Sequence, residues 1–165
     1  MKLFYRICWS IVRLYMILCK VQIKGAENVP EKGSVIIASN HIGAADPPFV
    51  GGCINRELFF LAKMELFKNP LLGFLFRNLN CIPVNRGVFD QRALEASQRA
   101  LRQGNGLILF PEGTRSKTGE LKRGKPGIGL LARKTLVPVV PAYIENSREF
   151  LRLPFSVRGF FQVQV

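Results

Sequence analysis

Short apolar runs alternate with polar, glycine-containing segments along the chain after Lys24. The clearest run, at 34–39, is rich in β-branched residues and is typical of a buried strand. Weaker strand patterns follow at 58–61, 81–84, 106–110 and 136–143, and prolines in the last favour an edge strand. Helical patterns lie at 46–53, 65–78, 88–103 and 127–134. This alternation predicts one α/β domain with a mixed, mostly parallel sheet flanked by helices.

The C-terminal sequence VRGFFQVQV alternates between apolar and polar residues, which predicts a further strand. The chain ends inside this pattern, as expected for a fragment or for a short member of its class. We therefore divide the sequence into an N-terminal segment, 1–23, and a domain, 24–165, that is a candidate for truncation at its C-terminus.

The N-terminal segment is apolar apart from Ser10 and four cations, Lys2, Arg6, Arg13 and Lys20. On a helical wheel these cations share a stripe about 40° wide. The uncharged runs are too short for a membrane span, which needs about 20 residues, and no signal-peptide cleavage site follows. We predict an amphipathic helix that lies in the membrane interface with its cations towards lipid phosphates. A helix docked on its own domain and a tilted span are the alternatives.

The amino-acid composition indicates an anionic partner. The chain carries 24 Lys and Arg against 11 Asp and Glu, a net charge of +13, yet 48% of its residues are hydrophobic. This apolar fraction excludes a disordered basic tail. The combination favours a membrane surface with anionic lipids. A nucleic-acid partner is disfavoured, because no basic helix with base-reading residues and no aromatic RNA-binding block is present.

The cysteines Cys8, Cys19, Cys53 and Cys81 form neither a C-x-x-C pair nor a cluster with histidine. A zinc site is therefore disfavoured. They are also too sparse for a disulfide scaffold, which favours a reduced, cytosolic compartment.

The single histidine, His41, is followed five residues later by Asp46. Residues with this spacing lie about 140° apart on a helix, so a contact requires a turn at Gly43 or a helix that begins at Pro47. A carboxylate bonded to one ring nitrogen leaves the other free to accept a proton from a hydroxyl. The alternatives are a buried structural histidine and an aspartate that only caps a helix.

A second polar group, FPEGTRS, follows the predicted strand at 106–110. Its glycine-freed amides, hydroxyls and Arg115 suit an oxyanion or a phosphate. The spacing is not that of a P-loop, and a polar hairpin loop is the alternative. Arg86 follows the strand pattern at 81–84 and, taken alone, is more often a surface arginine.

Taken together, SNHIGAADPP, CIPVNR, LFPEGTRS and VPVVPAYI resemble, in this order, the four motif blocks of the glycerolipid acyltransferases. The sequence is most similar to the bacterial 1-acyl-sn-glycerol-3-phosphate acyltransferases, which make phosphatidic acid. The resemblance covers 21–143. Many relatives have Ser at the position of Gly43 and Gly at that of Asn80.

The resemblance implies an O-acyltransferase of phospholipid biosynthesis, with His41 as general base and Asp46 as its orienting carboxylate. The free hydroxyl of lysophosphatidic acid would attack an acyl thioester of coenzyme A or acyl carrier protein. The acceptor's phosphate would be held by Arg86 and Arg115, with Glu112, Gly113 and Thr114 shaping the substrate-binding loop. No cofactor or metal is implied, and we expect a peripheral protein on the cytoplasmic face of the cell membrane.

Two alternatives to this function stay open at this point. The same chemistry on glycerol 3-phosphate or another lysophospholipid is one, because the residues do not identify the acceptor. A catalytically silent membrane-binding module is the other, and the intact His41–Asp46 pair argues against it. The apolar LLGFLF at 71–76 suits an acyl groove, although core packing is the simpler explanation.

Overall fold

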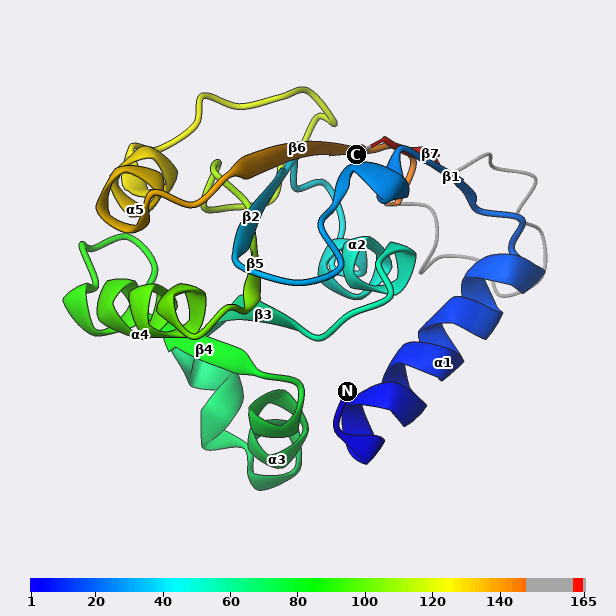
Figure 1. Ribbon diagram of the computed structural model, residues 1–165, viewed down its shortest axis with the longest axis horizontal. Helices are drawn as coiled ribbons and strands as arrows, with labels where there is room; N and C mark the ends of the chain where they lie inside the picture. Colours follow the sequence, from blue (N-terminus) through cyan, green and yellow to red (C-terminus); the bar gives the residue numbers. More distant parts are fainter. Residues whose placement is uncertain (148–161, 165) are drawn as a thin grey trace.

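The computed structural model describes residues 1–147 and 162–164, whose strands form one sheet in the order β1-β7-β6-β2-β5-β3-β4 (Figure 1). All neighbouring strands are parallel except β6 and β7, so the sheet is mixed and mostly parallel, as predicted. The strands are β1 (Gln22–Lys24), β2 (Val35–Ser39), β3 (Leu58–Lys63), β4 (Cys81–Val84), β5 (Gly106–Leu109), β6 (Val139–Ile144) and β7 (Gln162–Gln164).

Helices cover both faces of the sheet, with α1 and α2 on one side and α4 and α5 on the other (Figure 1). The α-helices are α1 (Leu3–Leu18), α2 (Asp46–Cys53), α3 (Pro70–Asn78), α4 (Gln91–Arg102) and α5 (Gly127–Thr135). Two short 3₁₀ helices, η1 (Ala26–Asn28) and η2 (Met64–Lys68), precede β2 and α3.

Strand β2 is the centre of both hydrophobic cores. Its residues Val35 and Ile37 belong to the cluster under α1 and α2, whereas Ile36 belongs to the cluster under α4 and α5. Successive side chains of a strand point to opposite faces, so a strand covered on both sides needs apolar residues at every position. This requirement explains the continuous apolar run that made β2 the clearest prediction.

Several element boundaries differ from the predicted ones. The helix expected at 65–78 is divided at Pro70, because proline lacks an N–H and favours the first helical turn. The side chain of Asn69 caps the resulting α3 by accepting hydrogen bonds from the backbone of Leu71 and Leu72. Helix α4 begins only after Asp90, whose carboxylate accepts a hydrogen bond from the Ala93 N–H.

The prediction that 136–143 forms an edge strand is wrong. Strand β6 lies between β2 and β7 in the sheet. However, on β6 the strand β7 pairs only with Tyr143 and Ile144, so Pro141 has β2 alone as its described neighbour and its missing N–H breaks no pairing there. Of the final predicted strand, 162–164 forms β7, and 157–161 and 165 lie outside the described residues.

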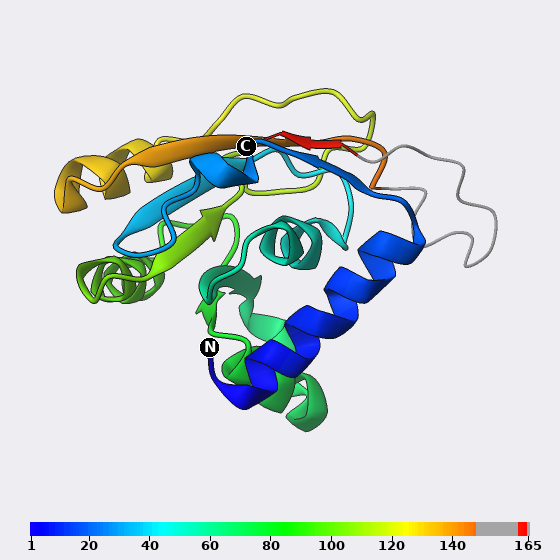
Figure 2. The same cartoon turned by 45° about the vertical axis from the view of Figure 1, so that its right-hand side comes forward.

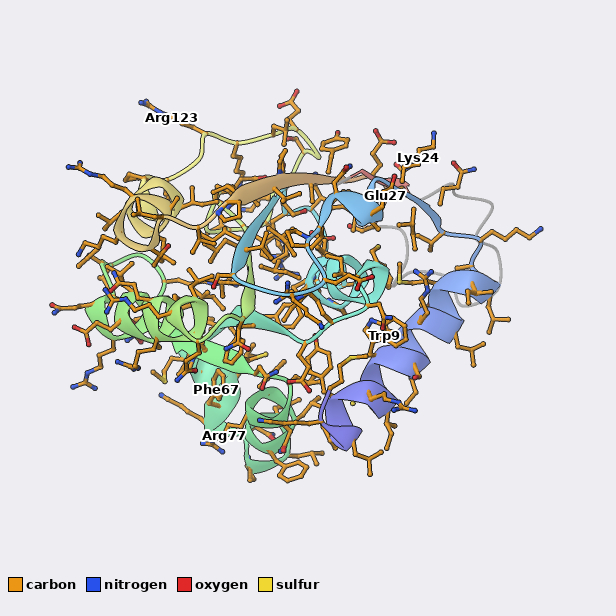
Figure 3. All side chains as sticks on the ribbon, in the orientation of Figure 1. Trp9, Lys24, Glu27, Phe67, Arg77 and Arg123 are labelled. Carbon is orange, nitrogen blue, oxygen red and sulfur yellow. The ribbon has the colours of Figure 1, made fainter. Side chains whose placement is uncertain are left out.

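Helix α1 is docked on its own domain along one face. Tyr5 and Met16 are buried, and the Trp9 indole, which points from α1 towards the domain in Figure 3, donates to the Ile54 carbonyl at 2.9 Å. A Cβ on Gly52 would lie 2.8 Å from the Met16 sulfur, so α1 packs closely on α2. This face of α1 therefore agrees with the alternative prediction of a helix docked on its own domain.

The opposite face of α1 is apolar and exposed. It carries six large aliphatic side chains, Leu3, Ile7, Ile11, Leu14, Ile17 and Leu18. The predicted basic stripe is interrupted, because Arg13 turns towards the domain and donates to the Gly52 carbonyl at 3.4 Å. Lys20 lies beyond the helix, which ends at Leu18 rather than at residue 23. In the described part of the chain, no helix is both long enough and apolar enough to cross a bilayer.

Candidate active site

The carboxyl end of β2 places His41 against the start of α2. The chain turns at Gly43–Ala45, and α2 begins at Asp46, so the two side chains meet. His41 Nδ1 lies 2.8 Å from Asp46 Oδ2. Both residues are buried, with exposed fractions of 6% for His41 and 0% for Asp46. The contact forms through the turn and helix entry that the five-residue spacing requires.

The Asp46 carboxylate is held by hydrogen bonds on both oxygens. Oδ2 also accepts from the backbone N–H groups of Ile42, at 2.6 Å, and Gly43, at 2.8 Å. Oδ1 accepts from the hydroxyl of Ser147, which is 1% exposed. These contacts come from two chain segments and leave the carboxylate one orientation.

The His41 ring is oriented by its other neighbours as well. The contact assigns the tautomer: an ionised carboxylate only accepts hydrogen bonds, so a neutral His41 ring beside it holds its proton on Nδ1 and its free electron pair on Nε2. The Phe110 ring stacks on the imidazole, with 4.3 Å between the ring centroids. The result is a ring with one nitrogen anchored and the other available to a substrate.

The FPEGTRS loop forms two hydrogen bonds with the main chain of His41. The carboxylate of Glu112 accepts from the His41 N–H at 3.0 Å, and the Ser116 N–H donates to the His41 carbonyl at 2.7 Å. Glu112 is 6% exposed, so it faces the histidine backbone rather than solvent. The two sequence motifs therefore form one structure, in which the loop supports the histidine.

Three residues that sequence reasoning missed complete this support. Asn40 pairs its amide with the backbone of Ile144, at 2.9 and 2.7 Å, and so ties the end of β2 to β6. Asn40 and Phe110 adjoin motif residues, so the motifs themselves were a signal for them. Ser147 is 101 residues from Asp46, and nothing in the local sequence marks it.

Arg86 and Arg115 are both exposed and line the same cavity as His41. No hydrogen bond or ion pair joins either guanidinium to another side chain in residues 1–147. Gly113 adopts φ 71°, a conformation that favours glycine, and Lys125 Nζ would lie 3.0 Å from a Cβ there. Thr114 is exposed on the same loop and lines none of the described cavities.

Two cavities reach His41 from different sides. The larger, about 600 Å³, lies among α1, α2, α3 and β3 and has a mostly apolar lining that includes Trp9, Phe60, Leu75 and Phe76. Leu75 and Phe76 belong to the LLGFLF segment, so part of that segment lines a cavity. The smaller, about 440 Å³, lies between the sheet and the helices α4 and α5.

The thiols of Cys53 and Cys81 are poor nucleophiles near neutral pH. Burial raises the pKa of each thiol to about 12. Among the residues that the structure describes, no three His, Cys, Asp or Glu side chains gather as a metal site requires.

Comparison with known proteins gives one consistent result. The sequence profile of the family described as Acyltransferase matches residues 20–145. A 1-acyl-sn-glycerol-3-phosphate acyltransferase of Borreliella burgdorferi is 31% identical over 141 residues, which cover 84% of this chain and 56% of that protein. A probable enzyme of the same name from Mycoplasma pneumoniae is 34% identical over 81% of this chain and 52% of its own length.

A relative from Bacillus subtilis with the same name is 29% identical over 90% of this chain and 76% of its own length. The crystal structure of the 1-acyl-sn-glycerophosphate (LPA) acyltransferase PlsC from Thermotoga maritima has a TM-score of 0.77 and 26% identity. That match covers 97% of this chain and 66% of the Thermotoga chain. The present chain thus spans about half the length of the first two relatives.

Proposed function

The chain belongs to the acyltransferase family, and on that premise we propose that it acylates the free hydroxyl of 1-acyl-sn-glycerol 3-phosphate to give phosphatidic acid. The names of its relatives support this acceptor. The observation that carries the proposal is the 2.8 Å contact between His41 and Asp46, in a cavity that also presents the guanidinium groups of Arg86 and Arg115.

His41 acts as the general base in this reaction. Its Nε2 takes the proton of the acceptor hydroxyl as the hydroxyl oxygen attacks the thioester carbonyl carbon. The C–S bond then breaks, and the leaving thiolate receives the proton from the imidazolium. Asp46 holds the ring and stabilises the imidazolium that forms. Base catalysis of this kind contributes about 10²- to 10⁴-fold to the rate.

Arg86 and Arg115 bind the phosphate of the acceptor. Both lie beside His41, and a guanidinium can bind phosphate through two parallel N–H donors. The apolar walls of the larger cavity provide space for a fatty acyl chain next to these cations. The cavity therefore suits an amphiphilic substrate that carries an anionic head.

The proposed location is peripheral, on the cytoplasmic face of the membrane. The exposed face of α1 continues onto α3, whose Leu71 and Phe74 are 76% and 57% exposed. Figure 2 shows the start of α1 beside α3, where the rings of Phe4 and Phe74 are 5.8 Å apart. An apolar surface of this kind suits insertion among lipid headgroups.

Vesicle flotation tests the membrane surface. The double substitution Ile7→Asp with Leu14→Asp places two charges on the exposed face of α1 and should abolish flotation with anionic vesicles. The control, Gln91→Asp with Gln103→Asp, adds two charges at exposed polar positions at the ends of α4, on the other side of the sheet, and should retain it. Equal flotation of the α1 double variant and the unaltered protein would contradict the assignment.

An acceptor panel tests the function itself. The purified protein should acylate lysophosphatidic acid with either palmitoyl-coenzyme A or palmitoyl-acyl carrier protein as donor. Glycerol 3-phosphate and lysophosphatidylcholine test the alternative acceptors, and monoacylglycerol tests the need for phosphate. Preference for glycerol 3-phosphate would replace the proposed acceptor, and equal turnover of monoacylglycerol would contradict the role of the arginines.

A further inference from the structure

The smaller cavity at His41 has no role in the mechanism given above. Resting on the proposed function, we infer that it binds the phosphopantetheine arm of the acyl donor. The anionic carrier of that arm, coenzyme A or an acyl carrier protein, would lie on the basic surface beside the cavity. The larger cavity then takes the acyl chain of the same donor.

The first argument is the position of the cavities relative to His41. Within the described chain, their linings have only His41, Leu61 and Arg86 in common. An acyl thioester is a long molecule with its reactive carbon in the middle, flanked by the fatty chain and the thiol arm. If that carbon lies at His41, the fatty chain and the thiol arm must extend from it in different directions. Two cavities that join at His41 satisfy this requirement.

The second argument is the lining of the smaller cavity. Its floor is apolar and buried, with Ala93, Ile108 and Leu131, and it reaches the candidate base. Its polar lining residues include Asn85, whose amide donates to the Asp90 carboxylate, and the exposed Lys125. The pantetheine arm combines aliphatic carbons with amide groups and ends in a phosphate. An apolar cavity that also presents amide, carboxylate and ammonium groups suits this combination.

A third observation is the charge of the chain segment that carries Lys125 and α5. Residues 115–134 carry seven cations against one acid, Glu120. All seven are exposed, and no ion pair involves any of them in residues 1–147. Figure 3 shows Arg123 projecting outwards from the loop that leads to α5. The seven are Arg115, Lys117, Lys122, Arg123, Lys125, Arg133 and Lys134. A surface of one sign attracts an anionic partner, and both carriers of the arm are anionic.

Two glycines of α5 provide a matched pair of variants for the arm. Gly127 lines the smaller cavity and Gly129 does not, and a Cβ at either position would meet nothing within 4 Å. Both are exposed, so leucine fits the backbone at each site. Gly127→Leu narrows the cavity, whereas Gly129→Leu adds the same side chain two residues further along α5, at a position that does not line the cavity.

The assay compares three donors with lysophosphatidic acid as acceptor. Palmitoyl-coenzyme A and palmitoyl-acyl carrier protein carry the whole arm, and S-palmitoyl-N-acetylcysteamine keeps the thioester but lacks most of the arm. Gly127→Leu should raise KM for the two complete donors about tenfold. The same variant should leave KM for the acceptor and kcat/KM for the truncated donor unchanged. Gly129→Leu should match the unaltered protein throughout.

The possible results separate the inference from the proposed function. Unchanged KM for both complete donors in Gly127→Leu overturns the inference, as does an equal loss with the truncated donor. Failure of the unaltered protein to acylate lysophosphatidic acid instead overturns the proposed function. The variant Lys117→Glu with Arg123→Glu tests the basic surface. A rise in KM for palmitoyl-acyl carrier protein alone indicates that the basic surface binds the carrier protein. An equal rise in KM for both complete donors indicates that it binds the phosphate that they share. Unchanged KM for both donors overturns the assignment of the basic surface.

Discussion

The two parts of the candidate site are held in opposite ways. His41 and Asp46 are buried, and hydrogen bonds from the turn before α2, from the FPEGTRS loop and from Ser147 fix them before any substrate arrives. Arg86 and Arg115 are exposed, and no side-chain partner holds their guanidinium groups in residues 1–147. A general base needs a fixed orientation relative to the proton it removes, whereas a phosphate ligand supplies the missing partners of the arginines on binding. Changes to the first part should therefore lower kcat, and changes to the second should raise KM.

Asp46→Asn should have the largest effect among the supporting residues. An amide in place of the carboxylate no longer requires the proton to sit on Nδ1, so Nε2 loses its role as acceptor. We expect kcat to fall about 10³- to 10⁴-fold, as for other bases that lose an orienting carboxylate. Thermal unfolding of the variant serves as the control for folding. A decrease of less than tenfold in a folded variant would show that the carboxylate does not orient the base.

Ser147→Ala should lower kcat about tenfold and leave KM unchanged, because Asp46 Oδ1 loses its hydroxyl donor. The chain has one histidine, so its Nδ1 proton resonance reports on His41 alone. That resonance should broaden through faster exchange in the variant. Ser34→Ala removes another serine hydroxyl, which donates to the Leu101 carbonyl away from the site, and should change neither quantity.

Gly43→Ala tests the same contact from the other side. A Cβ on Gly43 would lie 2.8 Å from the Ser147 hydroxyl oxygen, 2.9 Å from its carbonyl oxygen and 3.1 Å from Asp46 Oδ1, so it should separate Ser147 from Asp46. The double variant Gly43→Ala with Ser147→Ala should then have a kcat no lower than that of the more impaired single variant. Losses that multiply in the double variant would mean that the two positions act independently.

Arg115→Ala should raise KM for lysophosphatidic acid about ten- to a hundredfold and change kcat little, because the lost contact is with the bound phosphate. Steady-state kinetics at saturating donor measures both constants. Arg102→Ala removes an exposed arginine that lines neither cavity and should be neutral. A fall in kcat without a change in KM would assign Arg115 to the transition state instead.

Asp90→Ala should have a small effect on stability. Hydrogen bonds from the backbone of Asn85 and Ala93 lower the pKa of this carboxyl. Its stabilising contribution is therefore complete above the unfolded-state pKa and is lost as pH falls through the lower folded-state pKa. Loss of this helix cap should lower the free energy of unfolding by about 0.5 to 2 kcal/mol at neutral pH. Urea unfolding at neutral and acidic pH measures it, and a difference that grows on acidification would be the wrong sign.

The sequence predicts the parts of this molecule that depend on local pattern. β2 was found because it is covered on both faces, and α2 because Pro47 marks a helix start. His41 and Asp46 were found because the contact spans five residues. These features depend on burial or on backbone geometry over a few positions.

The parts that were missed depend on distant contacts. Ser147 reaches Asp46 across 101 residues, and no local pattern encodes that contact. The N-terminal helix has two apolar faces, and a helical wheel does not indicate which one docks on the domain. The structure assigns Tyr5 and Met16 to the docked face and turns Arg13 towards Gly52, which divides the predicted basic stripe.

The most direct test of the account is the rate of palmitoyl transfer to lysophosphatidic acid by the His41→Ala variant. Thermal unfolding and binding of lysophosphatidic acid should match the unaltered protein, because Arg86 and Arg115 are intact. Transfer should fall by at least about 10²-fold, the lower limit of a general base's contribution. Undiminished transfer by the folded variant would contradict the central claim that His41 activates the acceptor hydroxyl.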